Sequence, residues 1–78
     1  MTQLQIVANK LAKDGEVTRN WALSQFISRL SAIIYTLKYD YSWEIDGSWI
    51  SYKGKDGKTY RDYKYKLLKK GKEIRWQN

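Results

Sequence analysis

The sequence predicts an α+β domain in which three helices are followed by a two-stranded β-hairpin. Up to about Leu37, apolar residues recur at the i, i+3, i+4 and i+7 spacing that places them on one face of a helix. The second half carries β-branched and aromatic residues in two runs, which flank the turn-forming sequence Gly-Lys-Asp-Gly at residues 54–57. Because the chain has 78 residues and no cysteine, we expect one small domain without disulfide bonds.

The first helix is expected between Thr2 and Gly15. Threonine is a common N-cap residue, and glycine suits the left-handed conformation that often ends a helix. The apolar stripe of this helix consists of Leu4, Val7, Ala8 and Leu11. The next residues, Glu16 and Val17, are too few to assign from their pattern, although they are compatible with a minimal strand.

The following segment is expected to form two helices separated by a tight connection. Thr18 is the expected N-cap of the first of them, and Trp21, Leu23 and Phe26 are its large apolar residues, which we expect in the core. The second is expected to span Ile27–Lys38. Its apolar face, which we expect to pack against the stripe of the first helix and against Leu23, consists of Leu30, Ile33, Ile34 and Leu37.

The hairpin is expected to consist of the strands Ser48–Tyr52 and Lys58–Leu68, after a turn or bulge at Asp46-Gly47. On the second strand, alternation places Tyr63, Tyr65 and Leu67 on one face, which we expect to pack on the helices, and Asp62, Lys64 and Lys66 on the other. Residues 1–70 are thus the expected domain. Residues 71–78 are the expected C-terminal tail, in which Ile74 and Trp76 are apolar enough to dock, and disorder of the tail is the alternative.

The formal charge of +7 is concentrated in the last third of the chain. Residues 1–52 contain five basic and five acidic residues, whereas residues 53–78 contain ten basic residues and three acidic ones. Such an asymmetry favours an acidic partner, most often nucleic acid. The alternative interpretation is a solvated basic surface that only keeps the protein soluble.

Several classes of function are disfavoured by what the sequence lacks. It has no histidine and no cysteine, so it lacks the commonest general base, the commonest zinc ligand and any thiolate ligand. We therefore expect no enzyme activity, no metal site and no cofactor. No apolar run approaches the ~20 residues of a membrane span, and the N-terminus has no signal-peptide pattern, so we expect a cytoplasmic protein that does not enter membranes.

Three helices followed by a two-stranded hairpin is the element order of a winged helix-turn-helix, in which the hairpin is the wing. From Leu4 to Leu68 the chain also resembles the small helix-turn-helix domains that are common in phage and prophage genes. The residues that carry the resemblance are Val17-Thr18-Arg19, Ala22-Leu23, Phe26 with Ile27-Ser28-Arg29-Leu30-Ser31-Ala32, Ile34, Leu37 and Tyr65-x-Leu67. Members of that family usually have a glycine between the positions of Phe26 and Ile27 and another shortly after the third helix, and this chain has neither.

The resemblance implies a small basic DNA-binding protein, a regulator of the phage type, that places its recognition helix Ile27–Lys38 in the major groove of double-stranded DNA. Small side chains, hydroxyls and an arginine on an exposed helix face suit such a contact. The residues expected on that face are Ser28, Arg29, Ser31, Ala32, Tyr35 and Thr36. The residues expected on phosphates are Arg19 and Asn20 at a helix start and Lys53, Lys55, Lys58 and Arg61 on the wing.

Arg29 is the best candidate for a base contact, because a guanidinium can bond O6 and N7 of guanine together. A phosphate contact or a surface ion pair is the alternative for this residue. Since one helix and one wing contact few base pairs, we expect a homodimer on DNA.

Two other interpretations stay open at the level of sequence. The first is a protein-binding adaptor, or an inhibitor of a host protein, whose interface anchors are Tyr35, Tyr39, Tyr41, Trp43 and Trp49. The second is a single-strand or RNA binder, because Tyr60, Tyr63 and Tyr65 alternate with basic residues as in a stacking surface.

Overall fold

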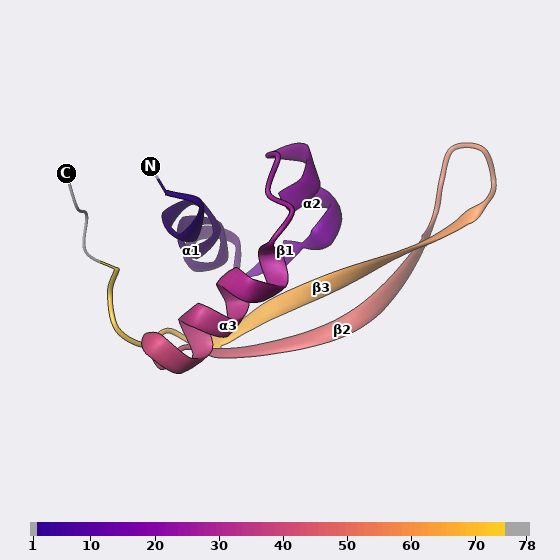
Figure 1. Ribbon diagram of the computed structural model, residues 1–78. Helices are drawn as coiled ribbons and strands as arrows, with labels where there is room; N and C mark the ends of the chain where they lie inside the picture. The colour runs from indigo at the N-terminus through magenta and orange to yellow at the C-terminus, as the bar shows by residue number, and fades with distance from the viewer. Residues whose placement is uncertain (1, 75–78) are drawn as a thin grey trace.

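The computed structural model describes residues 2–74, and in that part of the chain it has three helices and a three-stranded antiparallel sheet (Figure 1). The elements are α1 (Gln3–Asp14), β1 (Glu16–Thr18), α2 (Arg19–Ser24), α3 (Leu30–Asp40), β2 (Glu44–Lys53) and β3 (Thr59–Lys69). The α+β class and the hairpin are confirmed. The expected two strands are joined by a third, because β1 pairs with β3 and gives the sheet order β1-β3-β2.

Both expected helix N-caps are present. The Thr2 hydroxyl accepts a hydrogen bond from the Gln5 backbone N–H (3.2 Å), and the Gln5 side chain accepts one from the Thr2 N–H (3.0 Å), which forms a capping box. At the other end of α1, Gly15 has φ 80° and donates its N–H to the Leu11 carbonyl (2.8 Å). The Thr18 hydroxyl accepts a hydrogen bond from the Trp21 N–H at the start of α2 (3.1 Å).

The β2–β3 hairpin is longer than its sequence pattern indicates and extends away from the helices (Figure 1). The turn or bulge expected at Asp46-Gly47 does not lie there, because Gly47 is inside β2 and pairs with Tyr65. The irregularity in the β2–β3 register falls between Glu44 and Ile45. A glycine is needed at position 47 for a different reason, since a Cβ at Gly47 would lie 2.7 Å from atoms of the Tyr63 ring. The turn at residues 54–57 is confirmed, with the Gly54 N–H bonded to the Lys58 carbonyl (2.9 Å).

The core lies between α1, α3 and the end of the sheet that is far from the hairpin turn. Its buried hydrophobic residues are Val7, Ala8, Leu11, Val17, Ala22, Ile27, Leu30, Ile34, Leu37, Trp43 and Ile45. The expected core role of Leu30, Ile34 and Leu37 is thus confirmed. Trp21 and Leu4 are half-buried and pack against this cluster.

The expectation that Phe26 and Leu23 belong to the core is wrong, since 92% of Phe26 and 49% of Leu23 are exposed. The reason lies in how α2 ends. The Ile27 N–H donates to the Ala22 carbonyl (2.8 Å) and the Phe26 N–H to the Leu23 carbonyl (3.0 Å), which is the Schellman arrangement. Phe26 takes its left-handed position with φ 60°, so the chain reverses and Ile27 enters the core.

The third helix begins later than expected, at Leu30 in place of Ile27, and continues to Asp40. Residues 27–29 are a non-helical link between the reversal at Phe26 and α3. After α3, Ser42 also adopts a positive φ of 59°. The two turns at which the resembling family usually has glycine are therefore made here by left-handed Phe26 and Ser42.

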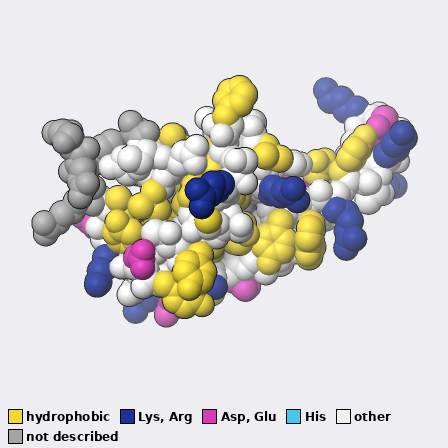
Figure 2. Space-filling model, in the orientation of Figure 1, with side chains coloured by type: hydrophobic (Ala, Val, Ile, Leu, Met, Phe, Trp, Pro, Cys, Tyr) yellow, Lys and Arg dark blue, Asp and Glu magenta, His cyan; other side chains and the backbone are white. Residues whose placement is uncertain are grey.

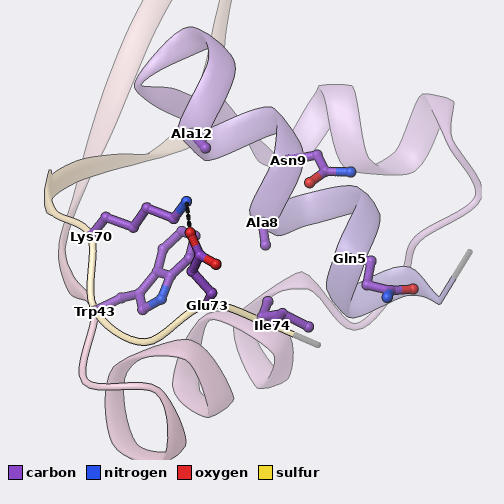
Figure 3. Close-up of a pocket in the computed structure, with 8 residues that line it drawn as sticks. All are labelled: Gln5, Ala8, Asn9, Ala12, Trp43, Lys70, Glu73 and Ile74. Atoms are coloured by element: carbon purple, nitrogen blue, oxygen red, sulfur yellow. Dashed lines mark ion pairs between the residues drawn. The ribbon is translucent and has the colours of Figure 1, made fainter. Parts of the chain in front are cut away.

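The segment after β3 returns to the core along α1. The Lys72 N–H donates to the Tyr41 carbonyl (2.7 Å), and the indole N–H of Trp43 donates to the Lys72 carbonyl (2.7 Å). Ile74 is half-buried against the core, which confirms its docking, whereas Trp76 lies outside the described residues. Figure 3 shows the hollow of about 200 Å³ that these residues leave beside α1, with the ion pair Lys70–Glu73 (4.0 Å) at its edge.

Replacing Phe26 by glycine should stabilise the fold. Relief of the left-handed strain, about 1–2 kcal/mol, is partly offset by the larger chain entropy of glycine, about 0.5–1 kcal/mol. We expect Phe26→Gly to raise the free energy of unfolding by about 0.5–1 kcal/mol in urea titrations. Phe26→Ala, which removes the exposed ring but keeps the Cβ, should stay within ~0.5 kcal/mol of the parent. An equal gain in both variants would refute the backbone explanation.

Candidate nucleic-acid interface

The exposed face of α3 carries most of the residues expected to read DNA. Ser31, Ala32 and Tyr35 are exposed on the helix, and Ser28 and Arg29 are exposed in the link before it. Arg29 occupies the N-cap position and makes no side-chain bond to the helix, so its guanidinium stays available. Thr36 is half-buried and donates its hydroxyl to the Ala32 carbonyl (3.1 Å), which makes it a weaker candidate.

The C-terminal half of this face is aromatic. Tyr35 and Tyr39, one helical turn apart, have ring centroids 4.3 Å from each other, and both rings are exposed. Residues four positions apart on a helix are neighbours, so each ring limits the motion of the other. The two rings thus add a large exposed apolar area to α3, and neither ring is part of the core.

One face of the hairpin continues from the core toward the turn, and we call it the inner face. Strand alternation and the register, with Trp49 opposite Tyr63 and Ser51 opposite Arg61, define its members. They are Trp49, Ser51, Lys53, Arg61, Tyr63 and Tyr65. The guanidinium of Arg61 lies 5.6 Å from the centre of the Trp49 ring, and the Tyr63 ring meets the Trp49 ring edge-on at 5.1 Å.

The hairpin turn is strongly basic. Lys53, Lys55 and Lys58 are exposed there, and Figure 2 shows dark blue side chains gathered at this end of the molecule. Within residues 2–74 the side chains of these three lysines form no ion pair, whereas Lys64, nearer the core, pairs with Glu16 (3.1 Å). The positive charge of the turn is therefore available to an outside partner.

Asp56, the one carboxylate of the turn sequence, is bonded within the turn itself. Its side chain accepts hydrogen bonds from the Tyr60 hydroxyl and from the Lys58 N–H (3.0 Å). The Tyr60 hydrogen bond, followed by that of Lys58, lowers the pKa of Asp56 below its usual value, and the same bond raises the pKa of Tyr60. Asp56 is thus ionised at neutral pH and fixes the turn that presents the lysines.

A hollow of about 300 Å³ separates α3 from the hairpin, and it joins three parts of the chain that are distant in sequence. It is lined by Arg19, Ser28, Leu30, Ser31, Trp49, Tyr63 and Tyr65. The structure thereby brings together Arg19, Ser28 and Ser31, which are expected on duplex DNA, with three aromatic residues. Of these, Tyr63 and Tyr65 belong to the single-strand alternative and Trp49 to the adaptor alternative. Burial, the main cause, raises the pKa of Tyr65 above its usual value, so its hydroxyl stays protonated at neutral pH.

The other residues expected to contact DNA from α3 and the link before it do not line this hollow. Arg29, Ala32 and Thr36 line a second hollow, of about 220 Å³, on the side of α3 that faces Gln3 and Leu4 of α1. The expected recognition residues therefore lie on two flanks of one helix. Ser28 and Ser31 face the hairpin, and Arg29 and Ala32 face away from it.

The backbone N–H expected to bind a phosphate at the start of α2 is instead bonded to a carboxylate of the protein. Asp62 of β3 is buried, with 5% of its surface exposed, and accepts hydrogen bonds from the N–H groups of Asn20 (3.2 Å) and Tyr63 (2.8 Å). The Asn20 side chain donates to the Tyr52 hydroxyl (2.8 Å). A carboxylate in this position repels a phosphate, so these contacts disfavour the phosphate contact expected of Asn20, which stays a prediction, whereas Arg19 is exposed and lines the hollow.

Within residues 2–74, no group of three or more histidine, cysteine, aspartate or glutamate side chains is placed to hold a metal ion. Among the helices of this range, none is both long and apolar enough to cross a membrane.

Comparisons of the chain with protein-family models, with curated proteins and with solved structures gave no match. The chemistry of the described surface is therefore the basis for assigning a function.

Removing the Asp62 carboxylate should detach α2 from the hairpin. Asp62→Ala leaves the Asn20 and Tyr63 N–H groups, whose bonds to Asp62 are part-buried, without their acceptor, so we expect the free energy of unfolding to fall by about 1–3 kcal/mol in thermal or urea unfolding. Asp46→Ala, which removes an exposed carboxylate from β2, is the matched control and should change it by less than ~0.5 kcal/mol. Equal effects of the two substitutions would show that the Asp62 contacts do not stabilise the fold.

Proposed function

We propose that this protein binds double-stranded DNA as a winged helix-turn-helix domain, with α2 and α3 as the helix-turn-helix and β2–β3 as the wing. The observation that carries the proposal is the hollow between α3 and the wing. One side of it presents the hydroxyls of Ser28 and Ser31, the other presents the inner face of the wing, and Arg19 lies on its wall. None of the seven residues that line it is acidic.

This arrangement matches the shape of duplex DNA. An α-helix fits the major groove, and the phosphate backbone that borders the groove would then run along the rim of the hollow toward the wing. Arg19 would contact that backbone, Ser28 and Ser31 would face base edges from the flank of α3 beside the wing, and Arg29 would do so from the opposite flank. Residues at the N-terminal end of a recognition helix are those that reach the bases in helix-turn-helix proteins.

The wing supplies most of the electrostatic attraction. Residues 53–69 contain seven basic side chains and two acidic ones, Asp56 and Asp62. Asp56 is bonded within the turn, and Asp62 is buried under α2. The exposed charges of residues 53–69 are therefore almost all basic, whereas the exposed carboxylates of β2, Glu44 and Asp46, lie at the end of the wing near the core. The basic charges favour phosphate contacts and the release of counterions from DNA.

One helix and one wing cover a short stretch of duplex. A homodimer on a palindromic site would double the contacts, and regulation of transcription from such a site, in the manner of phage regulators, is the use that we propose for the domain. Enrichment of a palindrome from a randomised duplex library would support both parts of this assignment.

A second function, as an adaptor that binds a host protein, is favoured by the exposed apolar residues at the end of α2. The ring of Phe26 is almost fully exposed, and Leu23 is half exposed one helical turn away. Exposed aromatic residues are frequent anchors of protein interfaces. Binding through such residues depends little on salt, whereas binding to DNA phosphates depends on it strongly, so a salt titration separates the two functions.

Removing charge from the wing should weaken binding to all DNA sequences. Lys55→Gln with Lys58→Gln removes two phosphate contacts, so the slope of log K against log salt should decrease by roughly 2 in fluorescence anisotropy titrations. The matched control is Lys13→Gln with Lys72→Gln, an equal charge change on exposed residues outside the wing, and its slope should stay close to that of the parent. An unchanged slope in the Lys55/Lys58 variant would remove the wing from the interface.

A carboxylate on α3 should block binding without unfolding the domain. Ala32 is exposed, so Ala32→Glu should leave the melting temperature nearly unchanged. It should raise the Kd for duplex DNA at least ~10-fold, because opposed like charges cost several kcal/mol. Ala12→Glu places the same charge on an exposed position of α1 and should bind almost as the parent does. If both variants bind equally well, α3 does not enter the groove.

A further inference from the structure

Trp49 is the large aromatic residue of the inner face that the fold leaves open. It lies on the wall of the hollow, and 60% of its surface is exposed. It makes two contacts with neighbours on the same face, with the Arg61 guanidinium over its ring at 5.6 Å and with the edge of Tyr63 at 5.1 Å. An indole held in this way is a flat surface with an adjacent positive charge.

The orientation of Trp49 depends on a row of rings that begins in the core. Tyr65 packs against the core cluster, and its ring centroid lies 5.0 Å from that of Tyr63. Tyr63 in turn lies over Gly47, where any side chain would collide with it. The row Tyr65, Tyr63, Trp49 is therefore anchored in the core at Tyr65 and ends at the exposed ring of Trp49, and all three rings line the hollow.

We propose that the hollow receives one unpaired nucleobase of a DNA strand, which stacks on Trp49. This inference rests on the proposed function and specifies the form of DNA that the site prefers. A flat aromatic surface takes any base by its π-face, and arginines beside it neutralise the adjoining phosphates. Arg19 and Arg61 are placed for the phosphates, and the hydroxyls of Ser28 and Ser31 for the edge of the base.

The size of the hollow agrees with a single base. About 300 Å³ is at the lower end of the range of small-ligand sites, roughly 300–1,000 Å³. Its wall combines three aromatic residues and one leucine with two hydroxyls and one guanidinium. Apolar walls with a few polar groups that fix orientation are typical of sites for flat, polar-edged molecules such as a base.

The opposite face of the wing carries an aromatic pair, Tyr52 and Tyr60, whose contacts are made within the protein. Tyr52 and Tyr60 stack with centroids 5.8 Å apart and rings inclined by 24°. Both hydroxyls are used within the chain, since Tyr52 accepts a hydrogen bond from Asn20 and Tyr60 donates one to Asp56. This pair lies outside the hollow, so Tyr52 is a matched control for Trp49.

The test compares two 20-base-pair duplexes that are identical except for one unpaired thymine in the middle of the second. Anisotropy titrations at fixed salt should show that the protein binds the second duplex about 10-fold more tightly. Trp49→Leu should reduce this ratio to about 1, because the unpaired thymine then has no indole to stack on, and the readout is the ratio rather than the Kd for either duplex. Trp49→Phe should retain a ratio above about 3, and Tyr52→Leu should retain the full ratio. Thermal unfolding of each variant verifies that it is folded.

The outcomes separate this inference from the proposed function. Equal binding of the two duplexes by the parent protein would overturn the base site and leave the duplex-binding function standing. A 10-fold ratio that persists in Trp49→Leu would also overturn it. Binding to neither duplex would overturn both proposals, and loss of the ratio in Trp49→Leu but not in Tyr52→Leu would establish the site.

Discussion

The chain reversal between α2 and α3 is the constraint on which the rest of the structure depends. Two hydrogen bonds, from Phe26 to Leu23 and from Ile27 to Ala22, end α2 after six residues and turn the chain at once. Ile27 can then enter the core, and α3 begins three residues later with Leu30 buried. The opposite face of α3 is consequently exposed beside the wing, which is where the hollow forms. One left-handed residue, at Phe26, thus fixes the position of every contact proposed for α3.

The parts of the fold that can be predicted from the sequence are those that depend on interactions between residues close together in the chain. Thr2, Gly15 and Thr18 cap helices through bonds to residues three or four positions away, so their residue types are sufficient evidence. The turn at residues 54–57 is equally local. The buried face of α3 follows from its periodicity, because only one face of an amphipathic helix can meet the core.

The parts that could not be predicted depend on partners far away in the chain. Strand alternation correctly predicts the face of β3 on which Asp62 lies. That face is not open to solvent at Asp62, because α2 covers it and donates a backbone hydrogen bond to the Asp62 carboxylate. Gly47 is typical of a turn in the sequence, but the reason for a glycine there is that the Tyr63 side chain lies over it in the folded protein. The aromatic wall of the hollow required the register of β2 on β3 and the position of α3 together, and neither is encoded in neighbouring residues.

Phe26 shows why strain is informative about function here. A glycine at this position would make the same turn without the steric cost of a left-handed side chain, about 1–2 kcal/mol. The ring offsets none of that cost by burial, because it is almost fully exposed. Folding alone therefore favours glycine, and a contact outside the chain would account for the phenylalanine. Since Phe26 is two residues from Ser28 at the start of the proposed DNA-reading face, such a contact would lie at the edge of the same interface, where a second protein could meet a domain already bound to DNA.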